Sequence, residues 1–357
     1  MKRREFLSYC VAAGMTIGLS ELASCISPVI PLSPANKDQL SGLLIADAHA
    51  HPYPLHSSRD YDFSTPTIEI MKQIGMVASS FSAVGDAVKY GGRSGMPYID
   101  TLNQLREVKR LEEKKKVKLI LKASDIQSLI IANDIPGAIM AIEGGDALEG
   151  KVSNLDSFYD YGVRMITVLH DHNNEIGFNQ RSQSDGPLTP FGIKIIEKMN
   201  ASGMIVDVAH SKTKTLKNIV EVSTIPVIDS HTNPLPDAYE SSKPTRLRTW
   251  SEMELIARTG GVICTWPFAY SQGVHPRTTL KHWAEEIILI KKRLGIEYCG
   301  LGTDGGGNLP QRVKGWESVV SLPDLIGAMR EAGLSQEDII AYVGGNFLRI
   351  LNRCLVA

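Results

Sequence analysis

The chain has 357 residues, of which 43% are hydrophobic and 22% are charged, so it carries enough apolar sequence to bury a large core. Lysine and arginine number 38 and aspartate and glutamate 39, and this balanced charge gives nucleic-acid binding no electrostatic support. The cysteines, Cys10, Cys25, Cys264, Cys299 and Cys354, show no CxxC or zinc-finger spacing, which argues against a disulfide framework and leaves open one pair among the last three.

Residues 1–24 have the pattern of an export signal. Lys2, Arg3 and Arg4 precede an apolar stretch, residues 6–19, that is too short for a membrane helix of about 20 residues. Residues 3–7 look like a twin-arginine signal, and residues 22–25 look like a lipobox that ends at Cys25. We therefore expect a signal peptide over 1–24, a lipid anchor on Cys25, a tether over 25–42, and a periplasmic or cell-surface location. The alternative is an ordinary cleaved signal followed by a chance cysteine.

Short apolar runs alternate with amphipathic stretches from residue 43 onward. The runs predict strands at 43–48, 77–84, 138–142, 164–169, 204–209, 226–229, 261–265 and 299–302, and residues 117–121 compete as a ninth. Helical patterns cover 98–115, 190–202, 251–259, 282–294, 322–332 and 335–351. Ser251 with Glu254 has the spacing of a capping box, and Ser335 opens the last helix.

About eight strand–helix units predict an α/β fold, a single-domain (β/α)₈ TIM-like barrel over residues 43–357. A Rossmann fold is disfavoured because no GxGxxG motif follows the first strand.

Polar side chains follow six of the predicted strands, where each strand ends. In a barrel these ends face one mouth, which is where active sites lie. The residues concerned are Asp47, His49 and His51 after the first strand, Glu143 after the third, His170 and His172 after the fourth, Asp207 and His210 after the fifth, Asp229 and His231 after the sixth, and Asp304 after the eighth.

These residue types favour a metal site. His49 and His51 are two apart on a strand, so their side chains point to the same side, and imidazoles suit zinc and similar ions. Glu143 is the natural carboxylate bridge, and His210 and His231 add nitrogen ligands. Such a site would lower the pKa of a bound water toward ~7. A single histidine after a strand is more often a hydrogen-bonded structural residue, and it is the combination that favours metal.

Four histidines are given no definite role in the site. His56, His275 and His282 are interpreted as surface or packing residues, and the role of His172 stays open.

The sequence resembles the membrane dipeptidase (renal dipeptidase) family, a binuclear zinc branch of the amidohydrolase-like barrels. The resemblance covers nearly all of residues 43–357. Its motifs are residues 141–145, 186–192, 199–200, 207–211, 230–233, 260–263, 302–304 and 344–349.

The resemblance implies a role for each matching residue in the metal site. His49 and His51 bind one divalent ion, Glu143 bridges two, and His210 and His231 bind the second, with zinc as the expected metal.

The resemblance also implies catalytic and substrate-binding roles. His170 polarises the substrate carbonyl and stabilises the oxyanion, and Asp304 handles the proton for the leaving amine. Arg248 matches the arginine that holds the substrate's terminal carboxylate, with Arg246 as the competing assignment because the spacing there is loose.

Two positions depart from the family's pattern. The first metal motif usually reads His, any residue, Asp, but here the third position is His51, which removes a negative charge. This puts the identity and affinity of the first metal in doubt. Residues 305–307 are all glycine where the family has bulkier, more acidic side chains, and this puts the substrate class in doubt.

We expect a hydrolase, a metal-dependent dipeptidase that cleaves small dipeptides with a metal-bridging hydroxide, and the family suggests a D-residue at the C-terminal side. The alternatives are an N-acyl amino acid deacylase or lactonase on the same barrel, and a lipoprotein that kept the barrel as a non-catalytic binding protein. Whether the protein forms a homodimer stays open.

Overall fold

The computed structural model describes residues 32–55, 66–86, 95–132, 134–237, 246–271, 276–307, 309 and 311–355. Residues 32–357 group as one compact unit. The predicted signal peptide and Cys25 lie outside the described residues, as do His56 and His275, so the statements about them stay predictions. None of the helices in the described ranges combines the length and the apolar character needed to span a membrane.

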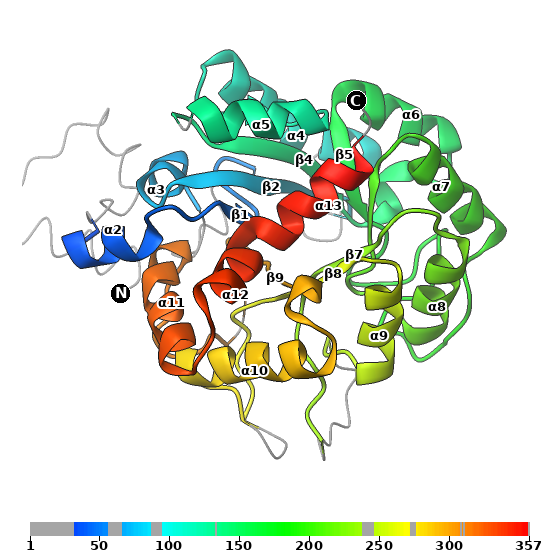
Figure 1. The fold of residues 1–357 in the computed structure, drawn as a ribbon. Helices are drawn as coiled ribbons and strands as arrows, with labels where there is room; N and C mark the ends of the chain where they lie inside the picture. The colour runs from blue at the N-terminus through cyan, green and yellow to red at the C-terminus, as the bar shows by residue number, and fades with distance from the viewer. Residues whose placement is uncertain are drawn as a thin grey trace, which may run out of the picture. The chain divides into compact units, whose positions relative to one another are not determined.

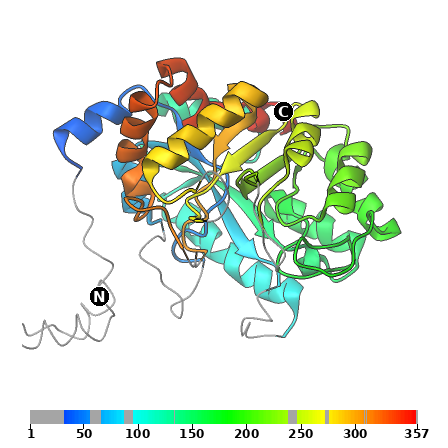
Figure 2. The same ribbon diagram turned by 90° about the horizontal axis from the view of Figure 1, so that it is seen from below.

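A parallel sheet forms the centre of the fold, and helices surround it (Figures 1 and 2). Eight of the described strands follow one another around a ring in the order β1-β2-β4-β5-β6-β7-β8-β9, and β3 pairs with β4 beside the ring. The strands are β1 (Ile45–Asp47), β2 (Met76–Val84), β3 (Lys118–Leu119), β4 (Gly137–Glu143), β5 (Val163–Thr167), β6 (Ile205–Asp207), β7 (Ile228–Thr232), β8 (Val262–Thr265) and β9 (Cys299–Leu301).

The ring closes where β9 meets β1. The Ala48 amide donates to the Leu301 carbonyl at 3.0 Å, and the His51 amide donates to the Gly305 carbonyl at 2.8 Å. The buried Asp47 carboxylate accepts from both the amide and the hydroxyl of Thr303, at 2.9 and 2.5 Å. The predicted barrel is therefore confirmed, and residues 117–121 contribute the short strand that lies off the ring.

The helices connect successive strands on the outside of the sheet (Figure 2). They are α2 (Pro34–Leu40), α3 (Ile68–Gln73), α4 (Pro97–Glu113), α5 (Ala123–Ala132), α6 (Val152–Tyr161), α7 (Pro190–Ala201), α8 (Thr213–Val222), α9 (Trp250–Arg258), α10 (Leu280–Arg293), α11 (Leu322–Glu331), α12 (Gln336–Ile340) and α13 (Asn346–Cys354), with short turns η3 (Gly145–Leu148), η4 (Ile296–Tyr298), η5 (Val319–Ser321) and the π turn η6 (Ala341–Gly345).

Local sequence explains where two of these helices begin, and in one case it was misread. Ser335 caps α12 in a reciprocal capping box with Asp338, as its position predicted. The predicted cap at Ser251 is wrong, because α9 begins earlier, with Thr249 as its cap and Glu252 completing the box. Both pairs show the same three-residue spacing, so propensity alone could not choose between them.

The last predicted helix is interrupted. The π turn η6 separates α12 from α13, and at Gly344 an added Cβ would lie 2.0 Å from the Leu44 carbonyl oxygen. Glycine is required there because the turn packs directly on the backbone leading into β1.

Helix α13 closes the amino end of the barrel. Its Phe347 and Leu351 pack with residues that face the barrel interior near the start of their strands, including Ile139, Ile205 and Val262. Figure 1 looks onto this end, with α13 lying across the ring. Because this plug fills the amino end, the open end is the one where the strands finish.

The segment before β1 differs from its prediction as a tether. Ser33 caps α2, Pro34 occupies the first helical position, and Leu40 is buried.

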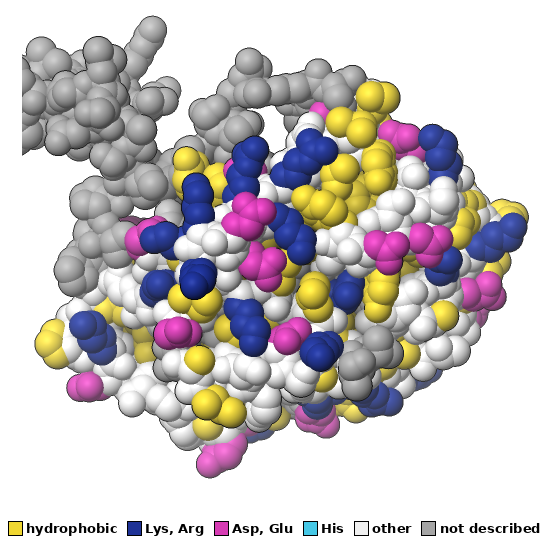
Figure 3. Space-filling model, turned by 90° about the horizontal axis from the view of Figure 1, so that it is seen from above, with side chains coloured by type: hydrophobic (Ala, Val, Ile, Leu, Met, Phe, Trp, Pro, Cys, Tyr) yellow, Lys and Arg dark blue, Asp and Glu magenta, His cyan; other side chains and the backbone are white. Residues whose placement is uncertain are grey.

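Cys264, Cys299 and Cys354 are buried and free. Figure 3 shows a face on which basic and acidic side chains are interspersed, as the balanced composition leads one to expect.

Candidate metal centre

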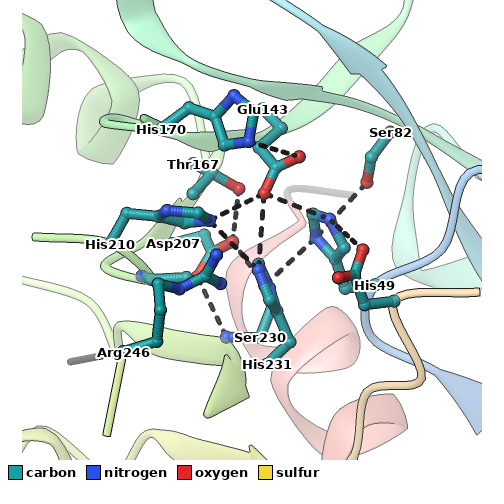
Figure 4. A network of polar contacts seen from close by, with 12 residues as sticks. His49, Ser82, Glu143, Thr167, His170, Asp207, His210, Ser230, His231 and Arg246 are labelled. Atoms are coloured by element: carbon teal, nitrogen blue, oxygen red, sulfur yellow. Dashed lines mark hydrogen bonds and ion pairs between the residues drawn. The ribbon is translucent and has the colours of Figure 1, made fainter. Parts of the chain in front are cut away.

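Four histidines and one glutamate meet at the carboxyl end of the barrel (Figure 4). They come from the ends of β1, β4, β6 and β7, and the structure brings together all five residues predicted to bind metal. His49, His51, Glu143, His210 and His231 are each at most 3% exposed. Their ring nitrogens and carboxylate oxygens face one another.

The first group of donors surrounds a point beside β1. The Nε2 atoms of His49 and His51 are 3.3 Å apart, and they lie 3.4 and 3.3 Å from the two carboxylate oxygens of Glu143. Donors held about 2.0–2.1 Å from a tetrahedral ion lie about 3.3–3.4 Å from one another. Asp304 adds an oxygen 3.4 Å from His51 Nε2 and 3.9 Å from His49 Nε2. These spacings fit a transition metal ion.

The second group lies on the other side of Glu143. His210 Nε2 is 2.9 Å from Glu143 Oε1 and 3.2 Å from His231 Nε2, and His231 Nε2 is 3.4 Å from the same oxygen. Three donors at these spacings leave a position open for water or substrate. Glu143 belongs to both groups, and it can therefore bridge two ions.

A hydrogen-bond network sets the tautomers of the rings. Ser230 Oγ donates to Asp207 at 2.6 Å, so its lone pairs accept from Nδ1 of His231 at 2.8 Å and Nδ1 of His49 at 3.2 Å. His51 Nδ1 donates to the Ser82 carbonyl at 2.7 Å. With Nδ1 carrying the proton, Nε2 of each neutral ring presents its lone pair to the centre, as a metal ligand must.

The electrostatics of the two groups differ. Burial opposes ionisation of Glu143, but the nearby His170 and His49 outweigh it and hold its pKa well below the usual value. Burial lowers the pKa values of His210 and His231 well below the ordinary histidine value, so both rings are neutral. Burial also disfavours charge on His51, yet the carboxylates of Asp304 and Glu143 raise its pKa to about 10. A proton and a metal ion therefore compete for His51 Nε2.

Two residues of the site have left-handed backbone. His210 has φ 63° and Asp304 has φ 47°, conformations that are uncommon for side chains other than glycine. The Asp304 amide donates to the His49 carbonyl at 2.8 Å, which locks this loop to the end of β1. Such strain persists where surrounding contacts determine the geometry, and it is common at functional sites.

The two candidate arginines occupy different environments. Arg248 is fully buried, and its guanidinium donates to Asp229 Oδ2 at 2.7 Å and to the carbonyls of Ser211 and Val208 at 2.5 and 2.6 Å. Every nitrogen of Arg248 is engaged in holding the ends of β6 and β7 together. Arg248, to which the sequence analysis assigned the substrate carboxylate, thus uses one N–H of each nitrogen within the protein.

Arg246 points toward the metal donors, beside His210 and His231 (Figure 4). Its guanidinium lies 4.8 Å from the Trp266 ring centroid, and its Nε and Nη2 make no hydrogen bond to any residue that the structure describes. Burial lowers its pKa from the usual arginine value, although the charges of Glu143 and Asp304 oppose this. A buried cation with unused donors suits an anionic group of a ligand.

His170 lies beside the centre, with Nε2 at 3.6 Å from Glu143 Oε2. Its Nδ1 is 2.7 Å from Asp86 Oδ1, a residue that sequence reasoning missed. Burial opposes the charged ring, but the carboxylates of Glu143 and Asp86 raise the pKa of His170 to about 9. The available signal for Asp86 was its position directly after β2, at the same mouth as the other site residues.

A family model and several known proteins match this chain. The family model described as "Membrane dipeptidase (Peptidase family M19)" matches residues 49–355. Dipeptidase tcpJ of Claviceps purpurea is 29% identical over 219 residues, covering 60% of this chain and 50% of that protein. An uncharacterized dipeptidase of Schizosaccharomyces pombe is 31% identical over 261 residues, 70% of this chain and 61% of that protein. The chain thus spans little more than half the length of these curated relatives.

A solved structure shares the fold. A metallopeptidase from Rhodobacter sphaeroides, liganded with a phosphinate mimic of the dipeptide L-Ala-D-Ala, superposes with a TM-score of 0.74 at 18% identity, covering 87% of this chain and 99% of that one.

Proposed function

Because the chain belongs to the membrane dipeptidase family, peptidase family M19, we propose that it is a metal-dependent dipeptidase. The observation that carries the proposal is the convergence of His49, His51, His210 and His231 on the shared carboxylate of Glu143. The donor atoms and the tautomers set by Ser230 and the Ser82 carbonyl suit two divalent ions, with zinc as the proposed metal. Bound there, such ions supply a hydroxide nucleophile at neutral pH and polarise the scissile carbonyl.

The residues around the centre have distinct proposed tasks. His170, with Nε2 directed toward Glu143, donates a hydrogen bond to the oxyanion that develops on the carbonyl. Asp304, beside His51 and 7% exposed, passes the proton to the departing amine. Both tasks require a carboxylate or a ring at the mouth of the barrel, which is where these two side chains lie.

Arg246 is the proposed anchor for the free carboxylate of the dipeptide. Its Nε and Nη2 lack hydrogen-bond partners among the described residues, and Trp266 supports the guanidinium plane. We propose this assignment in place of Arg248, because each nitrogen of Arg248 already donates a hydrogen bond within the protein. A carboxylate grip close to the reacting bond selects short substrates over long peptides.

A dipeptide with a D-residue at its C-terminal side is the proposed preferred substrate. The phosphinate in the Rhodobacter sphaeroides structure mimics L-Ala-D-Ala, and that protein shares this fold. The proposal for this chain rests on that likeness and on the family, since the described side chains do not distinguish the two stereoisomers.

The test is a substrate panel with the purified zinc-loaded protein. L-Ala-D-Ala and L-Ala-L-Ala should be hydrolysed, with the first preferred, and tri-alanine, N-acetyl-alanine and homoserine lactone should react at least about tenfold more slowly. Faster turnover of N-acetyl-alanine or the lactone would instead identify a deacylase or a lactonase.

Removing the shared carboxylate tests the metal dependence. Glu143→Gln should abolish turnover and lower the bound metal measured by mass spectrometry, whereas Glu331→Gln, on the exposed end of α11, should change neither. A Glu143→Gln protein with full activity would refute the proposed mechanism, and a zinc-loaded wild type that hydrolyses no dipeptide would refute the proposed function.

We also propose export and a lipid anchor at Cys25, supported by the basic start, the apolar stretch and the lipobox-like residues. Metabolic labelling with a radioactive fatty acid should mark the wild type and leave Cys25→Ala unmarked. Equal labelling of the two would remove the anchor.

A further inference from the structure

A row of side chains leads from the metal centre toward the surface, outside the set used above. It runs from His170 through Asp86 and His172 to Asp146. The side chains are 14% exposed at His170, 1% at Asp86, 22% at His172 and 16% at Asp146, so Asp86 is the buried member of the row. Carboxylates and imidazoles alternate along it, so each neighbouring pair attracts.

Asp86 is the junction of this row. Its Oδ1 lies 2.7 Å from His170 Nδ1, in a hydrogen bond. Its Oδ2 makes no hydrogen bond to any described residue and lies 3.2 Å from His172 Nδ1, an ion-pair contact. A carboxylate buried this deeply is costly unless it has partners, and the hydrogen bond to His170 together with the charge of a protonated His172 would supply them. The hydrogen bond fixes the His170 ring relative to Asp86.

His172 is held in turn from its far side. Its Nε2 lies 2.5 Å from Asp146 Oδ1, and Asn174 donates to Asp146 Oδ2 at 3.1 Å and to the Val168 carbonyl at 3.0 Å. Asn174 thereby ties the outer end of the row to the end of β5, the strand that leads into His170. The row forms a brace that starts and ends at the same strand.

We propose that Asp86 and His172 are positioning residues that hold the His170 ring with Nε2 directed at the reacting carbonyl. The role of His170 in this statement rests on the proposed function. Asp86 acts on the ring directly, and His172 acts through Asp86. Neither residue touches the metal donors, so both should affect turnover through orientation and leave metal binding unchanged.

A metal ion is the competing interpretation, because Asp86, Asp146 and His172 offer ligand atoms within 4.8 Å of one another. The arrangement around the His172 ring does not suit one ion. The two carboxylates face different nitrogens on the His172 ring, and one ion can take only one of those nitrogens.

A double-mutant cycle tests the proposal with L-Ala-D-Ala as substrate. Asp86→Asn should lower kcat by about 10- to 100-fold, as for other outer partners of catalytic rings, with KM and metal content near the wild-type values. His172→Gln, at a part-exposed position, should give a smaller fall. In a His170→Asn background neither change should reduce kcat/KM further, because both act through the missing ring.

The control is His282→Gln, which should leave kcat unchanged. His282 is a part-buried histidine on α10, and its Nδ1 lies 3.2 Å from the Thr278 amide nitrogen. Equal fold losses with and without His170 would mean a general structural role and would overturn the proposal. So would a third metal ion in the wild type that His172→Gln removes.

A second measurement does not depend on turnover. In a protein with ¹⁵N-labelled histidine rings, NMR reports which ring nitrogen carries the proton. Asp86→Asn should shift the His170 ring signals and leave those of His282 in place. Unchanged His170 signals would refute the brace, whereas inactivity of the wild type toward dipeptides would refute only the proposed substrate.

Discussion

Ser230→Ala removes one hydroxyl that orients a histidine in each donor group. Its Oγ lies 2.8 Å from His231 Nδ1 and 3.2 Å from His49 Nδ1. His231 would lose the acceptor that fixes its tautomer, and His49 would keep only the longer contact of its Nδ1 with Ser82 Oγ, at 3.5 Å. Asp207 keeps its hydrogen bonds from Thr167 and from the Ala209 and Ser230 amides, so the carboxylate is not left bare.

The expected effect can be set from the two lost contacts. Each neutral hydrogen bond contributes about 0.5–1.5 kcal/mol, and a buried N–H left without an acceptor costs about 1–3 kcal/mol. The lost acceptor of His231 corresponds to a fall in affinity of about 10- to 100-fold at the second group, in line with other outer-shell substitutions. The fall at the first group should be smaller, because His49 keeps the contact with Ser82 Oγ. Neither ion should escape the effect, because His49 and His231 belong to different groups.

The assay is zinc binding in competition with a chelator of known affinity, with circular dichroism as a check on the fold. Ser79→Ala is the matched control, because Ser79 is equally buried and its hydroxyl donates to the Ser80 carbonyl. Zinc affinities of Ser230→Ala within twofold of the wild type at both sites would show that Ser230 does not set the tautomers.

Three further changes test other parts of the site. Arg246→Ala should raise KM for substrates with a free carboxylate and leave the free energy of unfolding unchanged. Arg248→Ala breaks a buried ion pair, so it should lower the free energy of unfolding by about 3–5 kcal/mol in a denaturant titration. The reverse pattern would return the substrate role to Arg248. The raised pKa of His51, about 10, keeps a second proton on its ring, and zinc must displace that proton to bind. The zinc affinity of the first group should therefore fall about tenfold per pH unit between pH 8 and pH 6, as measured by calorimetric titration. A zinc affinity that does not change over this pH range would contradict the prediction. Asp304→Asn should abolish turnover and retain both ions, because His49, His51 and Glu143 remain; loss of one ion by mass spectrometry would make Asp304 a ligand.

The fold and the metal donors could be predicted because each depends on a local pattern. Every apolar run that was assigned to the ring overlaps a strand, and parallel strands bring their carboxyl ends together whatever lies between them. The positions of His49 and Glu143 at the mouth of the barrel could therefore be predicted without knowing any contact between distant segments. The metal itself stays a proposal, because the donor set limits the choice of ion without fixing it.

The features that the sequence analysis left open or overlooked depend on contacts between distant segments. Arg246 and Arg248 are two apart and alike in sequence, and only the position of Asp229 decides which of them is buried in an ion pair. Asp86 was overlooked because a single aspartate after a strand is also what a turn requires. The residues of helix α2 were interpreted as part of a tether because of the prolines in this segment. The helix cap at Ser33 and the burial of Leu40 were not considered.

The hydrogen-bonded contact between β1 and β9, here called the seam, has a consequence for how the metal-free protein opens. β1 is only three residues long, and His49 and His51 follow directly on it. Ions bound to these histidines and to Glu143 would clasp this short strand to the rest of the ring, so chelation should loosen the seam before the remainder of the barrel. Amide protons of Ala48, His51 and Asp304, which bridge the seam, should then exchange with deuterium faster in the stripped protein, while those in β4 and β5 keep their protection.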